Sequence, residues 1–363
     1  MTLKPKIIDR YIMKKFILTF FISLLLIIGI VIIFDISEKI DYFVKNEAPL
    51  KAIILDYYVN FVPYFMNMFS PLFVFITVIF FTSRLAANSE IIAILSGGVS
   101  YRRMMVPYVV SAALISILSL ALNLYVIPHS NSIRVPFEQK YVYPSRSFTS
   151  RNVHYQTAPG EFVYVASFSS WNNTAYKMTL ETLKHNRIVS KLSAESAVWD
   201  STEQCWHMRN WILRDYKSGT QDVVTMGEQL DTAFALTVDD FYRNEDSVAM
   251  LTIDELNELI DTQIMRGDDN VIYAQIEKHT RYALPFSAFI LTIMGVSLTS
   301  RKKRGGIGWN IAVGIALAFM YILFLRFSQM FVFTGTLPPV VAMWLPNVIY
   351  VFIAAVLYKM APK

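Results

Sequence analysis

The stretch FILTFFISLLLIIGIVIIF, residues 16–34, contains no charged side chain. A helix that crosses a hydrocarbon core about 30 Å thick needs about 20 consecutive apolar residues, so this stretch predicts a transmembrane helix. Lys14 and Lys15 precede it, as basic residues precede a secretory signal. The stretch is longer than the apolar part of a signal peptide, and no small-residue cleavage motif follows it. We therefore interpret it as a retained anchor.

Five more apolar blocks of this kind follow, and together the six predict an α-helical polytopic membrane protein with three spans before and three after a polar insert. The composition agrees, because 54% hydrophobic residues, 17% charged residues and a mean hydropathy of +0.40 are too apolar for a soluble domain. The six blocks are residues 16–34, 59–81, 104–127, 283–298, 309–331 and 340–357.

The basic residues beside these blocks predict the orientation, because Lys and Arg are retained on the cytoplasmic side of a membrane. The short loops of one face carry only Lys39, Lys45 and Lys51. We therefore expect both termini to be cytoplasmic and residues 128–280 to be exported. The net charge of +5 follows from this bias, so we do not interpret it as nucleic-acid binding. The other face carries Lys4, Lys6, Arg10, Lys14, Lys15, Arg84, Arg102, Arg103, Arg301, Lys302, Lys303, Arg304, Lys359 and Lys363.

The exported region alternates apolar and polar residues in short runs between about 153 and 236, which predicts an antiparallel β-sandwich or jelly-roll-like domain. Turn signals fall at Asn172-Asn173, His185-Asn186 and Ser218-Gly219. Residues 252–267 have the spacing of a short amphipathic helix. The expected organisation is membrane helices in 1–127, a β domain in 128–250, a helix and connector in 251–280, and membrane helices in 281–363.

The β domain cannot contain an intrachain disulfide, because Cys205 is the only cysteine of the chain. Its stability must come from an ordinary core, for which we expect Trp199, Trp206 and Trp211 to be used. The chain has no Gly-Lys dipeptide and so no P-loop, and it has neither an H-E-x-x-H nor a G-x-S-x-G motif. Cys205 and His207 form only a two-residue pair. We expect no catalytic residue, cofactor or metal site, and a separate chain must supply energy for any driven process.

The connection between the second and third blocks reads NSEIIAILSGGVSYRRMM, residues 88–105. It has helical periodicity up to Gly97-Gly98, where a helix is expected to end. On a continuous helix over about 84–97, Ala86, Glu90, Ala93 and Gly97 share one face. Such a face presents a carboxylate among small side chains, which suits a partner groove that contains an arginine. The alternative is a solvated acidic residue in an interfacial helix.

The segment NSEIIAILSGGVSYRR resembles the cytoplasmic coupling segment of the LptF/LptG (YjgP/YjgQ) permease family of the lipopolysaccharide export system. EKHTRYALPF, residues 277–286, and GTLPPVVAMWLPNVI, residues 335–349, resemble the beginnings of that family's fourth and sixth spans. The order of three spans, a β insert and three spans covers the whole chain. IIDRYIMKKF, residues 7–16, and DISEKIDYF, residues 35–43, resemble LptG more than LptF.

The resemblance implies one half of an ABC-type transporter of the bacterial inner membrane. A paralogous permease pairs with such a chain, and a cytoplasmic ABC ATPase dimer docks on its coupling helix. Lipopolysaccharide is drawn from the membrane and passed through the jelly roll to periplasmic bridge proteins of similar β-jelly-roll fold. The residues implied in ATPase coupling are Glu90, Ala86, Ala93, Gly97 and Arg102.

Basic side chains near the outer ends of the spans are candidates for binding the phosphates of lipopolysaccharide. Arg326 follows Trp309 by about 17 residues at about 1.5 Å per residue, which puts it near the outer boundary, although snorkelling to headgroups explains it equally well. The full set is Lys39, Lys45, Arg134, Lys278, Arg281 and Arg326.

Two other functions fit the same topology. A membrane-embedded lipid-carrier transferase would need clustered acidic or histidine residues, and the outward loops offer only the dispersed Asp35, Glu38, Asp41 and Glu47. A mechanotransmission protein would relay force and carry no substrate. A lateral opening lined with apolar residues and rimmed with Lys and Arg would favour transport over force transmission alone.

Overall fold

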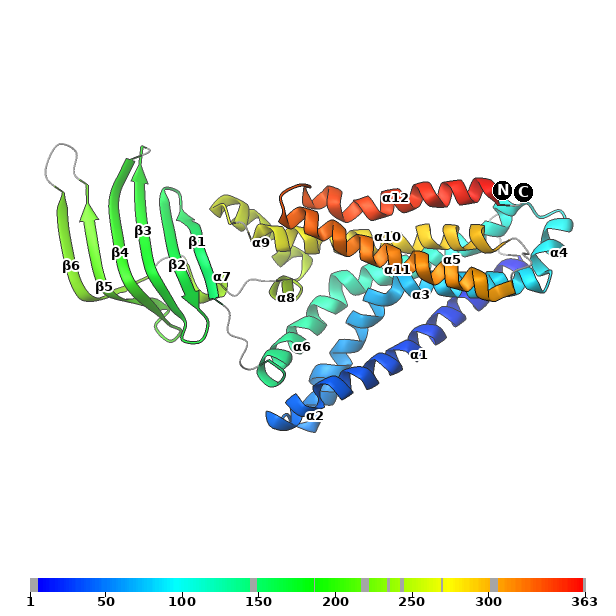
Figure 1. Ribbon diagram of the computed structural model, residues 1–363, viewed down its shortest axis with the longest axis horizontal. Coiled ribbons are helices and arrows are strands. Elements are labelled where there is room, and N and C mark those ends of the chain that lie inside the picture. Colours follow the sequence, from blue (N-terminus) through cyan, green and yellow to red (C-terminus); the bar gives the residue numbers. More distant parts are fainter. Residues whose placement is uncertain are drawn as a thin grey trace. The chain divides into compact units, whose positions relative to one another are not determined.

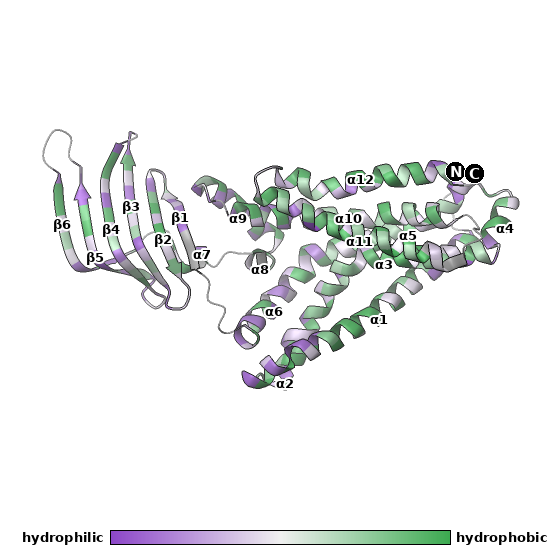
Figure 2. Ribbon diagram, viewed as in Figure 1, coloured by the Kyte–Doolittle hydropathy of each residue, from purple (hydrophilic) through white to green (hydrophobic). Residues whose placement is uncertain are grey.

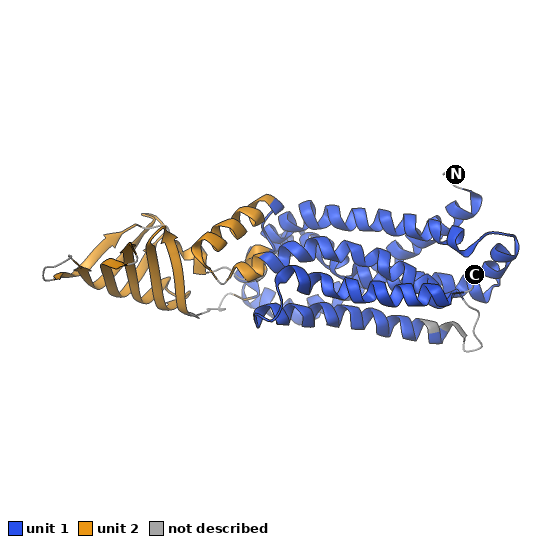
Figure 3. Ribbon diagram, turned by 90° about the horizontal axis from the view of Figure 1, so that it is seen from above, with its two compact units in different colours: residues 1–142, 249–253, 275–363 blue, residues 143–248, 254–274 orange. Residues whose placement is uncertain are grey.

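The computed structural model describes residues 6–143, 149–185, 187–216, 222–233, 236–241, 245–268, 270–300 and 306–361. The chain divides into a helical unit, residues 1–142, 249–253 and 275–363, and a second unit, residues 143–248 and 254–274 (Figure 3). Some predictions fall outside the described residues. These are the Ser218-Gly219 turn, Asn186, and the basic residues Lys4, Arg301, Lys302, Lys303, Arg304 and Lys363.

Six helical segments are long and apolar enough to span a membrane (Figure 2). Each contains one predicted block, except that the fifth segment begins two residues after its block does. The prediction of three spans, a polar insert and three more spans is therefore confirmed. The six segments are residues 7–45, 50–87, 101–141, 271–299, 311–333 and 339–360. They are built from α1 (Ile7–Lys45), α2 (Leu50–Ala52), the π-helix η1 (Ile53–Tyr58), α3 (Val59–Ala87), α5 (Tyr101–Ala121), the π-helix η2 (Leu122–Val126), α6 (Ile127–Tyr141), α10 (Val271–Thr299), α11 (Gly306–Phe333) and α12 (Pro339–Met360) (Figure 1).

Several of these helices extend beyond their apolar blocks. Helix α1 has 39 residues, a length of about 58 Å, and so exceeds a hydrocarbon core of about 30 Å. The third span continues through η2 and α6 to Tyr141, so the expected domain boundary at Pro128 falls inside a helix. The π-helical turn just before Pro128 opens the backbone ladder where proline lacks an N–H, which lets the helix continue.

The helical unit is held together by apolar side chains at helical spacing. On α1 the buried residues Ile12, Phe16, Phe20, Leu24 and Ile28 recur at every fourth position. This stripe belongs to one core cluster with residues of α3 and α5. Helices α3 and α11 also approach closely, because a Cβ at Gly314 would lie 2.1 Å from Cδ1 of Ile79. Such contacts fix how the helices are arranged around the sites described below.

The described strands of the second unit form one antiparallel sheet in chain order (Figure 1). The strands are β1 (Thr149–Ala158), β2 (Glu161–Ser169), β3 (Thr174–Lys184), β4 (Arg187–Asp200), β5 (Cys205–Asp215) and β6 (Val223–Thr232). An inserted antiparallel β domain is thus confirmed, and Asn172-Asn173 forms the turn between β2 and β3. The sandwich or jelly-roll prediction called for two facing sheets, and the described strands form one.

One face of the sheet is covered by a short segment instead of a second sheet. Leu236 and the helix α7 (Val238–Phe241) join the buried side chains of the sheet in one cluster. The ring of Phe241 stacks on Phe168 at 4.2 Å between centroids. Trp206 is fully buried there, whereas Trp199 and Trp211 are partly buried. Two helices follow, α8 (Glu245–Val248) and α9 (Ile253–Arg266), and α9 coincides with the predicted amphipathic helix.

Candidate functional site

The predicted helix over residues 84–97 is interrupted, and this changes the predicted coupling face. Helix α3 ends at Ala87, and a new helix, α4, runs over Glu90–Ser96. Ser89 between them has a φ of 61°, a left-handed conformation that ends the hydrogen-bond ladder of α3. Ala86 therefore stays on α3, where it is buried in the helical core. It is not part of a face shared with Glu90, Ala93 and Gly97.

Glu90 contacts its own chain. Its carboxylate accepts hydrogen bonds from the Tyr11 hydroxyl at 3.1 Å and from Nδ2 of Asn88 at 3.3 Å. Tyr11 lies on α1 and also bonds to Lys15. The half-buried carboxylate thus ties the first turn of α4 to α1, and it does not stand alone on a bare face as the sequence pattern predicted.

The outward side of α4 consists of Ile92, Ala93, Ser96 and Gly97, all exposed, and we call it the α4 surface. Ile91 beside it is buried and anchors the helix to the core. Ile92 is 49% exposed, an apolar side chain among small ones. Sequence reasoning missed Ile92, although the pair of isoleucines at 91 and 92 indicates that one of them must face away from the core. Small neighbours allow another backbone to approach this surface closely.

The start of α5 is joined to α1 and to the residue that follows α10. Arg103 forms a two-point ion pair with Asp9 of α1, at 2.8 Å from Nη1 to Oδ1 and 2.5 Å from Nη2 to Oδ2. Such a fork fixes geometry as well as charge. Tyr101 shares a hydrogen bond with Ser300 at 3.2 Å. The helix that carries the α4 surface and the start of α5 are therefore both bonded to the N-terminal part of α1.

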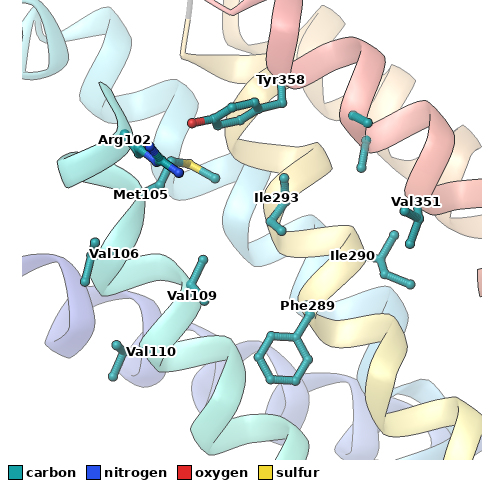
Figure 4. Close-up of a pocket in the computed structure, with 12 residues that line it drawn as sticks. Arg102, Met105, Val106, Val109, Val110, Phe289, Ile290, Ile293, Val351 and Tyr358 are labelled. Carbon is teal, nitrogen blue, oxygen red and sulfur yellow. The ribbon is translucent and has the colours of Figure 1, made fainter. Parts of the chain in front are cut away.

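A groove of about 620 Å³ lies between α5, α10 and α12 (Figure 4). Its walls are apolar, with Val109, Phe289, Ile293 and others, while Arg102 and Tyr358 lie at one end. Arg102 is exposed and lines this groove. Apolar walls with a basic residue at the rim are the feature expected of a chain that contacts lipid.

Two of the six predicted phosphate-binding cations lie in a buried charge network. Lys39 pairs with Asp35 at 2.9 Å and with Glu138 at 3.1 Å, and it also bonds to the Tyr57 hydroxyl. Arg134 pairs with the other oxygen of Glu138 at 3.0 Å. The charges of the two cations and the two carboxylates sum to zero. Their ion pairs join α1 to α6, and the bond between Lys39 and Tyr57 adds η1. We call Asp35, Lys39, Arg134 and Glu138 the four-charge network.

Arg281 is also engaged inside the helical unit, with 2% of its surface exposed. It pairs with Glu277 at 2.7 Å and donates to the carbonyl of Leu251 at 2.8 Å. Of the remaining candidates, Lys45 and Arg326 are exposed and Lys278 is half-buried. Arg326 donates to Oε1 of Gln329 at 3.2 Å. Among the described residues, the six cations thus do not converge on one site.

Comparison with known protein families identifies the family of this chain. A search of curated proteins found no significant relative. The model of the family described as "Lipopolysaccharide export system permease LptF/LptG" matches residues 10–360. This match covers the inserted sheet and all six helical segments except the first three residues of α1, and it agrees with the resemblance of the three sequence segments. The chain belongs to the LptF/LptG family of lipopolysaccharide export permeases.

Proposed function

We propose that this permease is one half of an ABC-type transporter that extracts lipopolysaccharide from the bacterial inner membrane. A separate cytoplasmic ATPase dimer docks on the α4 surface, a paralogous permease completes the membrane part, and both termini are cytoplasmic. The β unit receives the lipid and passes it to periplasmic bridge proteins of β-jelly-roll fold. Residues 7–16 and 35–43 support the LptG paralogue. The exposed α4 surface, standing on contacts to α1, is the observation that supports an external energy source.

The contacts of α4 and α5 with α1 support a route by which a movement of the ATPase reaches the membrane spans. Glu90 connects α4 to Tyr11 of α1, and Arg103 connects the start of α5 to Asp9 of the same helix. Both contacts end on the first turns of α1, whose far end carries Lys39 of the four-charge network. Displacement of α4 would therefore move α1 as a rigid rod.

The burial of the cations supports separate tasks for them. Lys39, Arg134 and Arg281 hold helices and loops in place by internal pairs. The exposed Lys45 and Arg326 and the half-buried Lys278 are the candidates that remain for the phosphates of lipopolysaccharide. A photoreactive residue at position 326 should capture the lipid. If Arg326 only snorkels to the headgroups of the bilayer, the photoreactive residue at this position would give no specific crosslink to lipopolysaccharide.

Ala93→Arg should prevent docking of the ATPase. A long charged side chain at the centre of the α4 surface keeps the partner groove away, which at an interface hot spot costs about 2 kcal/mol or more, about 30-fold in affinity. The measurement is co-purification of the tagged ATPase with the full-length permease. Ala233→Arg, the same change at an exposed position after β6, is the matched control. Equal recovery of the ATPase with both variants would contradict docking at α4.

Tyr11→Phe separates docking from transmission. It deletes the hydroxyl that bonds to Glu90 and leaves the α4 surface intact, so the ATPase should still co-purify. Lipid-stimulated ATP hydrolysis should fall about 3- to 10-fold, which corresponds to about 0.7–1.4 kcal/mol, the usual net contribution of one hydrogen bond. Tyr42→Phe, an exposed tyrosine on the same helix, is the control. If Glu90→Arg and Tyr11→Phe both left assembly and stimulated hydrolysis unchanged, Glu90 would have no part in coupling.

A further inference from the structure

A group of metal-ligating side chains gathers at the turn between β4 and β5. Asp200 ends β4, and Cys205 pairs with it across the hairpin at the start of β5. Cys205 and His207 lie on either side of the buried Trp206 along the strand, so both point to the face opposite the core. Glu203 lies in the turn itself. Side chains of Asp200, Glu203, Cys205 and His207 thereby reach one small region, which we call the hairpin cluster.

Donor atoms of Glu203, Cys205 and His207 all lie within 4.8 Å of one another, and Asp200 approaches this group at His207. Nε2 of His207 lies 3.7 Å from Oδ2 of Asp200, 4.0 Å from Oε2 of Glu203 and 3.9 Å from Sγ of Cys205. Sγ of Cys205 lies 3.8 Å from Oε2 of Glu203. Tetrahedral zinc, with bonds of about 2.0–2.3 Å, holds its ligand atoms about 3.3–3.7 Å apart. A contraction of a few tenths of an ångström would therefore bring Glu203, Cys205 and His207 around one ion, and Asp200 beside His207 supplies the fourth ligand in this proposal.

The histidine is already oriented for ligation. Its Nδ1 lies 2.6 Å from Oδ1 of Asp231, its cross-strand partner on β6. A carboxylate only accepts hydrogen bonds, so Nδ1 must carry the proton. In the neutral ring Nε2 then carries the lone pair and faces the other three ligands. A carboxylate behind a metal-binding histidine is the usual arrangement in proteins, because it fixes the tautomer and increases the basicity of the ring.

We propose that Asp200, Glu203, Cys205 and His207 form a binding site for a divalent transition-metal ion, with Zn²⁺ as the preferred ion. The combination of thiolate, imidazole and carboxylate donors favours zinc over magnesium and calcium, which prefer oxygen alone. The three carboxylates of Asp200, Glu203 and Asp231 supply negative charge around the ion. The ligands are partly exposed, so the ion enters directly from solvent.

The competing explanation is a protonated histidine held by carboxylates. The hydrogen bond to Asp231 raises the pKa of His207, and an imidazolium would satisfy the surrounding acidic groups without an ion. That explanation gives Cys205 no role and predicts no metal binding at neutral pH. The two explanations therefore differ in the part played by the sulfur atom.

A bound ion would also stabilise the sheet. The ligands come from β4, the turn and β5, and Asp231 extends the contact to β6, whose only neighbour in the described sheet is β5. Since the unfolded chain does not hold these groups together, binding energy becomes folding energy. The melting temperature of the β unit should then rise with zinc concentration. The zinc site does not depend on the proposed transport function.

The test uses the full-length permease in detergent, freed of metal with a chelator and titrated with Zn²⁺ or Co²⁺ at neutral pH. We expect one ion per chain, and with cobalt a thiolate-to-metal charge-transfer band. Cys205→Ser should abolish the band. His207→Gln should weaken zinc binding by more than about 100-fold and Asp231→Asn by about 10- to 100-fold, as for a residue that orients a ligand. His185→Gln, an exposed histidine in the β3–β4 turn, should bind like the parent chain.

Two results would overturn the site. One is the absence of stoichiometric zinc binding by the parent chain, which the imidazolium explanation predicts. The other is binding of equal strength in Cys205→Ser, His207→Gln and His185→Gln, which would place the ion elsewhere. Because the cluster lies on the face opposite the core, these variants keep the sheet. Circular dichroism of each variant verifies this.

Discussion

Lys39→Met is expected to lower the free energy of unfolding of the permease by about 3–5 kcal/mol, the cost of removing one partner from a buried ion pair. The change leaves Asp35 and Glu138, which are 2.9 and 3.1 Å from the ammonium group, without their shared cation. Arg134 still pairs with Glu138, but Asp35 has lost the cation with which it was paired. The shift appears in the thermal or detergent-induced unfolding midpoint of the purified chain.

Lys45→Met is the matched control, since Lys45 is exposed near the end of the same helix. It should change stability by no more than about 0.5 kcal/mol, as surface substitutions usually do. Adding Asp35→Asn to Lys39→Met should restore part of the loss, because it removes one uncompensated charge. If Lys39→Met were as stable as Lys45→Met but no longer bound lipopolysaccharide, Lys39 would be a phosphate ligand and not a structural residue.

Trp206→Ala should destabilise the β unit by about 3–5 kcal/mol, the usual cost of truncating a large buried aromatic side chain. Trp206 is fully buried, and its Nε1 donates to the carbonyl of Leu236 at 2.8 Å. Its ring lies 5.2 Å from Trp199 and 6.2 Å from Phe241, between centroids. The change therefore opens a cavity and also releases the segment that covers the sheet.

The measurement is the temperature at which a protease begins to cleave within residues 149–232 of the full-length chain, with the cuts located by mass spectrometry. When opening is fast, cleavage reports the population of the unfolded unit. Trp171→Ala is the control, since 80% of that side chain is exposed. Cleavage of both variants at the same temperature would show that Trp206 does not hold the sheet and its covering segment together.

The prediction of the coupling face illustrates why part of the site could not be obtained from the sequence. Helical periodicity runs through residues 84–97 without a proline, so a continuous helix is the natural prediction. The left-handed backbone at Ser89 interrupts it, and this conformation is uncommon for serine. The break buries Ala86 on α3 and turns Glu90 towards Tyr11, a residue 79 positions away.

The hairpin cluster is a second site that the sequence alone does not predict. Cys205 and His207 alone were a two-residue pair, and a metal site was not expected. The hairpin adds Asp200 and Glu203, and the register of β5 with β6 places Asp231 against His207. The four proposed ligands lie within residues 200–207, but their side chains approach one another only through the hairpin of β4 and β5, and Asp231 reaches His207 only through the pairing of β5 with β6.

By itself the sequence determined the six spans, the inserted antiparallel β domain and the family resemblance. Span length, alternation and motif identity are properties of neighbouring residues, and a local pattern suffices to predict them. Only the tertiary structure decided that the strands form one sheet, that Arg281 and Lys39 are buried, and that Lys39 meets Glu138, 99 positions away. Whether a cation stabilises the fold or binds a ligand depends on the charges packed against it, and packing joins residues that are distant in the chain.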